Sequence, residues 1–159
     1  MFKRILVPID GSATSNQGLQ QAIQLAKDQK ATLLLLHVVD ESPLVQSAVA
    51  SGALFTNLLD SLTRAGEKIL QKAEGLARQK RVRVSSTLVE NSLGPVADAI
   101  LKSAKKLRAD LIVIGTHGRR GGARLIMGSN AESVVRQSTV PVLLIRSKTR
   151  AAAARRRKK

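Results

Sequence analysis

The stretch Gly115-Thr116-His117-Gly118-Arg119-Arg120-Gly121-Gly122-Ala123-Arg124-Leu125-Ile126-Met127-Gly128-Ser129 decides how the rest of the chain is interpreted. A purely apolar run precedes it at 111–114, and a helical pattern follows from Ser129. The stretch is therefore predicted to be a glycine-rich loop between a buried strand and a helix N-terminus. Backbone N–H groups and the helix dipole can hold a phosphate group at such a place.

Strand-like runs and helical stripes alternate on both sides of this loop. Strands are predicted over 3–9, 31–39, 82–90, 110–114 and 140–145. Helices are predicted after Ser12, over about 54–80, from Gly94-Pro95, and over 129–137. Such alternation predicts an α/β fold with a parallel sheet and right-handed crossovers.

Several local details follow from the same patterns. Ser12 is predicted to cap the first helix, and Pro95 to occupy the first position of the third. Strand 82–90 mixes polar and apolar residues, which is typical of an edge strand. The inner face of the long helix is predicted from apolar residues at helical spacing: Leu58, Leu62, Ala65, Ile69, Ala73, Leu76 and Ala77.

Composition limits the possible functions. The chain has 159 residues and no cysteine, which excludes a disulfide framework and a thiolate metal site. Phe2 and Phe55 are the only aromatic residues, which argues against a platform for stacking bases. No signal-like N-terminus and no apolar run of the ~18 residues that a membrane span needs is present, so we expect a cytoplasmic protein.

The distribution of charge predicts a single domain over residues 1–146, followed by a basic tail over residues 147–159. The formal net charge is +16, and the tail carries seven Lys or Arg and no acid. The tail is low in complexity and is expected to be disordered. Nonspecific binding of an anionic partner by this tail is one possibility, and a plain solvated extension is the alternative.

Five segments together identify a family. They are Ile5-Leu6-Val7-Pro8-Ile9-Asp10-Gly11-Ser12, Leu36-His37-Val38-Val39, Asp110 to Arg119, Gly128 to Val134, and Val140-Pro141-Val142-Leu143-Leu144-Ile145. Over residues 1–146 the chain strongly resembles the universal stress protein family. The resemblance implies a Rossmann-like fold with a five-stranded parallel sheet in the order 3-2-1-4-5, with helices on both faces. That order would bring Asp10 and Gly115 to the switch point where ligands bind in open α/β sheets.

ATP-binding members of that family carry glycines at a fixed spacing before a Ser or Thr. Gly115, Gly118, Gly128 and Ser129 fit this spacing in full. The loop is not a Walker A loop, because no Lys stands directly before Ser129. The resemblance therefore implies an ATP-binding stress-response or regulatory protein rather than a P-loop enzyme.

The residues predicted to bind the nucleotide come from both halves of the chain. They are Pro8, Asp10, Val38, Gly115, Gly118, Arg119, Met127, Gly128, Ser129 and Asn130. The resemblance implies that the backbone of Val38 meets the adenine. Alternative roles are open for several: Val38 and Met127 as core residues, the glycines as residues of a flexible loop, and Asp10 as part of a turn.

Asp10 could hold the ribose or a Mg²⁺ ion that accompanies ATP. Ser129 could bind a phosphate oxygen or form a capping box with Glu132. His117 is expected to face solvent, and His37 to be a satisfied residue near a strand end. We predict no catalytic residue, although slow ATP hydrolysis or autophosphorylation is an alternative to a binding module.

The last strand, 140–145, is apolar on both faces although it should lie at an edge of the sheet. An exposed apolar edge invites pairing with another strand, and a two-fold partner would bury it. We therefore expect a homodimer through this strand, as the family resemblance also implies.

Overall fold

The computed structural model describes residues 1–42, 52–116 and 127–146. Its elements, in chain order, are β1 (Arg4–Pro8), α1 (Ala13–Gln29), β2 (Thr32–Asp40), α3 (Gly52–Gln79), β3 (Arg83–Asn91), α4 (Val96–Lys106), β4 (Leu111–Gly115), α5 (Ser129–Gln137) and β5 (Val142–Ile145). The strands form one sheet in the order β3-β2-β1-β4-β5, and every neighbouring pair is parallel. The predicted fold class, strand order and edge positions of β3 and β5 are confirmed.

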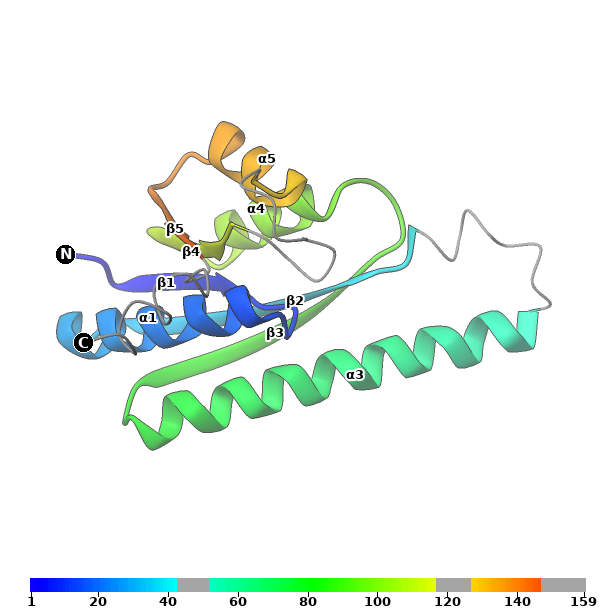
Figure 1. Cartoon of the computed structure of the whole chain (residues 1–159), viewed down its shortest axis with the longest axis horizontal. Coiled ribbons are helices and arrows are strands. Elements are labelled where there is room, and N and C mark those ends of the chain that lie inside the picture. Colours follow the sequence, from blue (N-terminus) through cyan, green and yellow to red (C-terminus); the bar gives the residue numbers. More distant parts are fainter. Residues whose placement is uncertain (43–51, 117–126, 147–159) are drawn as a thin grey trace, which may run out of the picture.

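Helices cover both faces of the sheet, α1 and α3 on one side and α4 and α5 on the other (Figure 1). Because neighbouring residues of a strand point to opposite faces, β1 supplies Ile5 and Val7 to the first core and Leu6 to the second. All three are fully buried. Aliphatic side chains on both faces of the central strands explain why these strands lack polar alternation.

The start of α1 follows the prediction. The Ser12 side chain accepts a hydrogen bond from the backbone N–H of Ser15 at 3.1 Å, which makes Ser12 the N-cap. The other end of α1 closes at Lys30, whose backbone is left-handed with φ 55°.

The inner face of α3 differs from the prediction. Leu70, Ala73 and Ala77 are buried, but Leu58 is 41% exposed and Leu76 40% exposed. Ala65 is exposed as well. The 28 residues of α3 span about 42 Å at 1.5 Å per residue, whereas a nine-residue strand such as β3 spans about 30 Å. The N-terminal half of α3 therefore extends past the sheet it covers (Figure 1).

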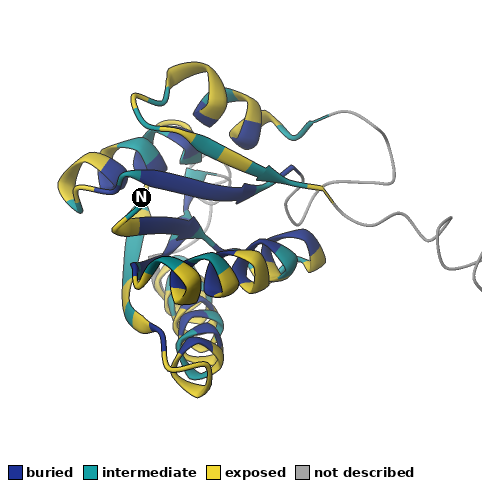
Figure 2. Ribbon diagram, turned by 90° about the vertical axis from the view of Figure 1, so that its left-hand side faces the viewer, coloured by how far each residue is buried: buried dark blue, intermediate teal, exposed yellow. Residues whose placement is uncertain are grey.

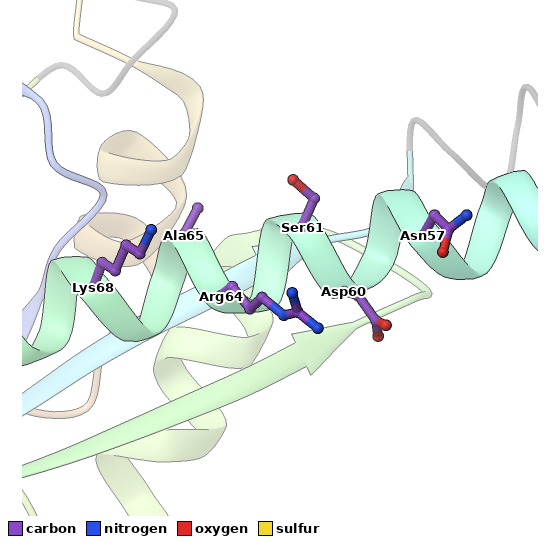
Figure 3. Close-up of a pocket in the computed structure, with 6 residues that line it drawn as sticks. All are labelled: Asn57, Asp60, Ser61, Arg64, Ala65 and Lys68. Carbon is purple, nitrogen blue, oxygen red and sulfur yellow. The ribbon is translucent and has the colours of Figure 1, made fainter.

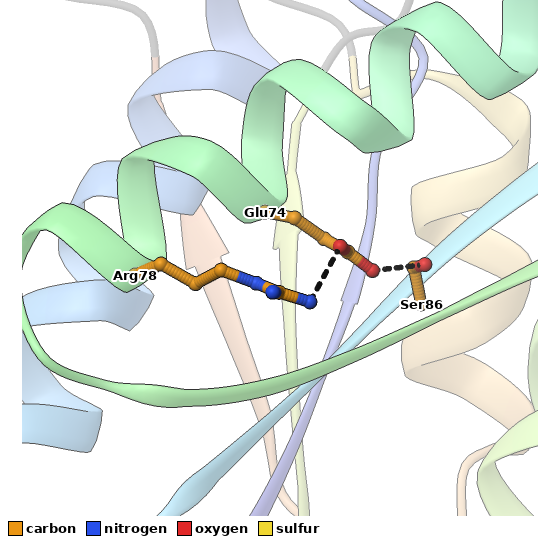
Figure 4. Close-up of polar contacts among 3 residues, drawn as sticks. All are labelled: Glu74, Arg78 and Ser86. Atoms are coloured by element: carbon orange, nitrogen blue, oxygen red, sulfur yellow. Dashed lines mark hydrogen bonds and ion pairs between the residues drawn. The ribbon is translucent and has the colours of Figure 1, made fainter.

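Polar contacts attach the second half of α3 to the edge strand β3. Arg78 and Glu74 form an ion pair of 3.1 Å on the helix, and the Ser86 hydroxyl of β3 donates to the other carboxylate oxygen of Glu74 (Figure 4). One carboxylate thus joins a helix cation to the sheet.

Two further boundaries are corrected. Pro95 is the N-cap of α4 and not its first helical residue, since its ψ of 141° is extended. β5 begins at Val142, so Pro141 precedes the strand and contributes only its carbonyl, which accepts the Ile112 N–H at 3.0 Å. The boundary of the basic tail at residue 147 lies outside the described residues. Among the described helices, none combines the length and the apolar character required to cross a bilayer.

Candidate functional site

The carboxyl ends of β1 and β4 lie side by side at the point where the strand order reverses. β1 has β2 on one side and β4 on the other, with Leu6 paired to Ile112 in register. Three residues further on lie Ile9, directly after β1, and Gly115, the last residue of β4. Asp10 and Gly115 therefore lie at the switch point of the sheet, the position at which open α/β sheets bind ligands.

Two backbone hydrogen bonds connect the end of β4 to β5 and to α5. The Thr116 N–H donates to the Ile145 carbonyl at 2.9 Å, and the Gly128 N–H donates to the Thr116 carbonyl at 2.8 Å. The two ends of the glycine-rich loop are thus held together. Sequence reasoning missed Thr116, because a backbone contact across a loop leaves no compositional signal. The predicted residues Gly118 and Arg119, and also His117, lie outside the described residues.

The predicted capping box at α5 is wrong. Gly128 is the N-cap, with φ −66° and ψ 146°, and Ser129 is already the first helical residue. The Glu132 N–H donates to the Gly128 carbonyl at 3.0 Å, and the Glu132 carboxylate pairs with Arg136 at 2.7 Å. Ser129 and Asn130 are exposed at this helix N-terminus. The Ser129 side chain therefore has no capping role.

Asp10 forms the turn that leads from β1 into α1. Its Oδ1 atom accepts the Ser12 N–H at 2.9 Å, and its own N–H donates to the Ser15 hydroxyl at 3.4 Å. Gly11 between them has φ +81°, a conformation that favours glycine. The Asp10 side chain therefore lies just beyond the carboxyl end of β1. This position is compatible with the turn role and with a ligand role.

Gly115 is required by packing against the start of α1. A Cβ atom at this position would lie 2.9 Å from Thr14 Cγ2 and 3.3 Å from the Ser15 backbone nitrogen. The missing side chain lets the N-terminus of α1 approach the end of β4. Together with the start of α5, two helix N-termini therefore converge beside the ends of β1 and β4.

His37 contacts the backbone next to Asp10. The residue is 6% exposed, and its Nδ1 atom lies 2.7 Å from the Ile9 carbonyl, so Nδ1 carries the proton and donates. A Cβ atom on Gly66 of α3 would lie only 2.4 Å from His37 Cδ2. His37 is satisfied, as predicted, but it lies within β2 rather than at its end. An isolated glycine inside a helical pattern was the available signal for this contact.

Pro8, Val38 and Met127 are half-buried. Val38 and Met127 pack against the core on the α4 and α5 side of the sheet. Their alternative role as core residues is therefore present, and each still reaches partial exposure near the carboxyl edge.

Two surface hollows lie elsewhere. One of about 360 Å³ follows the exposed side of α3, where Asn57, Asp60, Ser61, Arg64, Ala65 and Lys68 line it (Figure 3). Another of about 440 Å³ lies between the end of α4 and the turn before β5. The described lining of neither hollow includes a residue predicted to bind nucleotide. Within the described ranges, no group of three or more His, Cys, Asp or Glu residues forms a metal site.

Comparison with known proteins supplies the family. The universal stress protein family profile matches residues 1–146. Universal stress protein MJ0531 of Methanocaldococcus jannaschii is 35% identical over 92% of this chain and 83% of its own length. Universal stress protein YxiE of Bacillus subtilis is 36% identical over 92% of this chain and its own full length. Both relatives thus match almost the whole described domain.

Solved structures agree with these relatives. Protein MJ0577 superposes with a TM-score of 0.82 at 26% identity, covering 94% of this chain and 99% of its own. An Arabidopsis thaliana universal stress protein with AMP bound, 19% identical, has a TM-score of 0.68 over 94% of both chains. An Archaeoglobus fulgidus universal stress protein in complex with dAMP, 21% identical, has a TM-score of 0.65 over 90% of this chain and 97% of its own. Family profile, relatives and fold agree: this chain belongs to the universal stress protein family.

Proposed function

We propose that this chain is an ATP-binding regulatory protein of the stress response that acts as a nucleotide-binding module. The hydrogen bond from the Gly128 N–H to the Thr116 carbonyl carries the proposal, because it brings the start of α5 to the end of β4. The N-terminus of α1 packs against Gly115 at the same place. Helix N-termini favour anions through free N–H groups and the helix dipole.

Each predicted residue has a role in this proposal. Gly115 and Gly128 let the backbone approach the phosphates closely, the first turn of α5 presents backbone N–H groups to them, and the Ser129 hydroxyl adds a donor that no helix cap uses. The remaining predicted residues complete the site: Pro8, Val38 and Met127 beside the base and sugar, and Gly118, Arg119 and Asn130 along the phosphates. The known complexes of family members with AMP and dAMP support the choice of an adenine nucleotide.

Mg²⁺ with ATP fits the same edge. Mg²⁺ usually binds through one or two carboxylates together with the phosphates and water. Asp10 offers such a carboxylate at the end of β1. Cytoplasm, where ATP is abundant, remains the expected compartment.

The chain has no Trp or Tyr and absorbs little at 280 nm, so the absorbance of a bound nucleotide is easily detected in the purified protein. Acid extraction of the purified protein followed by chromatography should release an adenine nucleotide. Titration of nucleotide-free protein with Mg-ATP should give binding heat and a higher melting temperature. If there is neither extracted nucleotide nor any response to Mg-ATP, the proposal is wrong.

The role of Asp10 is tested by Asp10→Asn. Asn keeps an oxygen for the Ser12 N–H, so the turn and the fold should persist. We expect the affinity for Mg-ATP to fall by about tenfold, roughly 1.4 kcal/mol. The affinity for ATP in EDTA should change little. Equal affinities of both proteins for Mg-ATP would exclude Asp10 as a metal ligand.

A binding module and a slow enzyme are distinguished by phosphate release. For a binding module, we expect the rate of phosphate release to equal that of buffer alone. The measurement uses a protein–ATP complex whose stoichiometry has been determined. A rate above background that disappears in Asp10→Ala and Gly118→Val would instead support ATP hydrolysis at this site.

We also propose a homodimer through β5. This strand ends the sheet and is apolar, with Leu143 40% exposed. Leu143→Arg should weaken the dimer at least tenfold, about 1.4 kcal/mol, because it places a charge in the apolar seam. Analytical ultracentrifugation of both proteins measures this. A wild-type monomer at micromolar concentration would contradict the dimer.

A further inference from the structure

Three turns at the opposite, amino edge of the sheet share one construction. In a parallel α/β fold every helix returns the chain to this edge, so α1, α3 and α4 all end there. Each ends with the same backbone hydrogen bond, from a residue two or three beyond the helix to a carbonyl five residues earlier. The bonds are Ala31 to Ala26 at 2.9 Å, Val82 to Ala77 at 3.1 Å, and Ala109 to Ala104 at 2.9 Å. This is the Schellman motif.

The residue in the left-handed conformation is a cation in all three motifs. Lys30 has φ 55°, Arg81 φ 58° and Arg108 φ 51°. Glycine is the usual residue here, because a side chain in this conformation costs about 1–2 kcal/mol. The chain thus accepts local strain three times and keeps a long cationic side chain each time.

Each of these cations also has a second cation three residues earlier, one helical turn away. These are Lys27, Arg78 and Lys105. All six side chains are exposed, and Arg78 alone of them forms an ion pair with a described carboxylate. Figure 2 looks directly at this edge, and the turns that join helices to strands there are largely exposed.

The helix dipole explains only part of this pattern. Cations in a last helical turn stabilise the dipole by about 0.3–1 kcal/mol. The end of α1 is already satisfied by Arg83, which donates to the Lys30 carbonyl at 2.8 Å. Likewise, Arg4 donates to the Leu107 carbonyl at the end of α4 at 2.7 Å. The extra cations at the left-handed positions are therefore available for another use.

The cations lie on both sides of the sheet, after α1 and α3 on one side and after α4 on the other. Lys102, Lys105 and Arg108 also line the hollow of about 440 Å³, with Ser138 and Thr139 among its other lining residues. One phosphate group cannot contact charges that are this widely spread. An extended polyanion can, because a duplex carries one charge per about 1.7 Å of its axis.

We propose that the amino edge binds the phosphate backbone of a nucleic acid duplex without reading its sequence. Phe2, the aromatic residue at this edge, is half-buried against the core, so the edge offers no aromatic platform for single-stranded bases. Ala31, Val82 and Ala109 at the three turns are at most 8% exposed, and Met1 is the one strongly exposed large apolar residue that the described residues place at this edge, so the edge presents no apolar patch to a bilayer. This surface is separate from the proposed nucleotide site, and the proposal does not depend on ATP binding.

The test replaces the three left-handed cations in the full-length protein by Lys30→Asn, Arg81→Asn and Arg108→Asn together. Asn tolerates the left-handed conformation, so the fold should be kept and melting should confirm this. The control removes three charges elsewhere, on the exposed side of α3, by Arg64→Gln, Lys68→Gln and Lys72→Gln. Both variants retain the basic tail.

Fluorescence anisotropy with a short DNA duplex of arbitrary sequence is measured over a range of salt concentrations. We expect the amino-edge variant to bind at least tenfold more weakly at about 0.1 M salt. Its slope of log K against log salt should be less steep by about 2–3, one unit for each lost phosphate contact. The α3 variant should bind more tightly than the amino-edge variant, close to wild type.

Equal losses in both variants would reduce the effect to net charge and overturn the proposal. Unchanged binding by the amino-edge variant would overturn it as well, and would assign any binding to the tail. Phosphatidylserine vesicles serve as the second probe. Binding to vesicles that depends on these three cations, without binding to DNA, would contradict the choice of nucleic acid.

Discussion

The two edges of the sheet meet the same backbone requirement with opposite residues. At the carboxyl edge, the turns after β1 and β3 contain Gly11 with φ +81° and Gly94 with φ +87°. At the amino edge, the corresponding left-handed positions are Lys30, Arg81 and Arg108. Glycine has no side chain, so a ligand can approach the backbone closely. A Lys or Arg at the same kind of position keeps a long charged side chain in solvent.

Charge follows the same division among the described residues. Segments at the ends of β1, β2 and β3 carry Asp10, Asp40, Glu41 and Glu90. The amino-edge turns carry mainly Lys and Arg. Among the described residues, the groups available to an anion at the carboxyl edge are therefore backbone N–H groups and helix dipoles. An anion at the amino edge would depend on side-chain charge, and its binding should be more sensitive to salt.

The largest expected loss of stability tests whether the contact between Gly66 and His37 supports the carboxyl edge. Gly66→Ala puts a Cβ atom 2.4 Å from the His37 ring, which donates to the Ile9 carbonyl next to Asp10. We expect a loss of about 1–3 kcal/mol in the free energy of unfolding, because the buried ring must move. Weaker ATP binding should accompany it. Chemical denaturation and calorimetry measure both.

The matched control lies on the same helix, nearer the amino edge. A Cβ atom on Gly75 would meet nothing within 4 Å. Gly75→Ala should therefore stabilise the protein by about 0.5–1 kcal/mol through helix propensity. Similar effects of the two substitutions would show that the His37 contact does not support the carboxyl edge.

A smaller change in stability is expected when the left-handed residues of the two kinds of turn are replaced. Gly11→Ala should destabilise the protein by about 1–2 kcal/mol, because alanine strains at positive φ. Arg81→Asn should leave stability within about 0.5 kcal/mol of wild type, because Asn tolerates that conformation. Thermal and urea unfolding compare the two. A large loss from Arg81→Asn would mean that Arg81 is kept for stability rather than for binding.

The smallest expected changes in stability distinguish the roles of Ser12 at the start of α1 and Ser129 at the start of α5. Ser12→Ala removes a cap whose oxygen accepts the Ser15 N–H, and should cost about 1 kcal/mol of stability. Ser129→Ala should change stability by less than about 0.5 kcal/mol, since Gly128 is the N-cap. Only Ser129→Ala should lower ATP affinity without a change in unfolding. Equal stability losses would restore Ser129 as a cap.

Much of this arrangement could be predicted from local patterns. Apolar runs such as Leu33 to Leu36 marked buried parallel strands, and Ser12 marked the start of α1. The alternation of polar and apolar residues placed 82–90 at an edge. These features depend on neighbours in sequence, or on the rule that parallel strands need covering helices.

The errors have a common physical origin. Leu58 and Ala65 were assigned to the inner face of α3 because periodicity reports a helical stripe but not where the sheet beneath it ends. The cap of α5 was misplaced by one residue because Gly128 is held by the Thr116 carbonyl, across a loop. Contacts of this kind depend on how elements meet, and no local pattern records them.

The sequence by itself determined the α/β class, the buried central strands and the glycine spacing that points to a nucleotide. It could do so because periodicity, turn chemistry and charge are local properties of the chain. Only the tertiary structure decided that two helix N-termini converge at one edge, while three cationic turns gather at the other. Residues as distant as Lys30 and Arg108 become parts of one surface only because every helix of the parallel fold ends at the edge where the next strand begins.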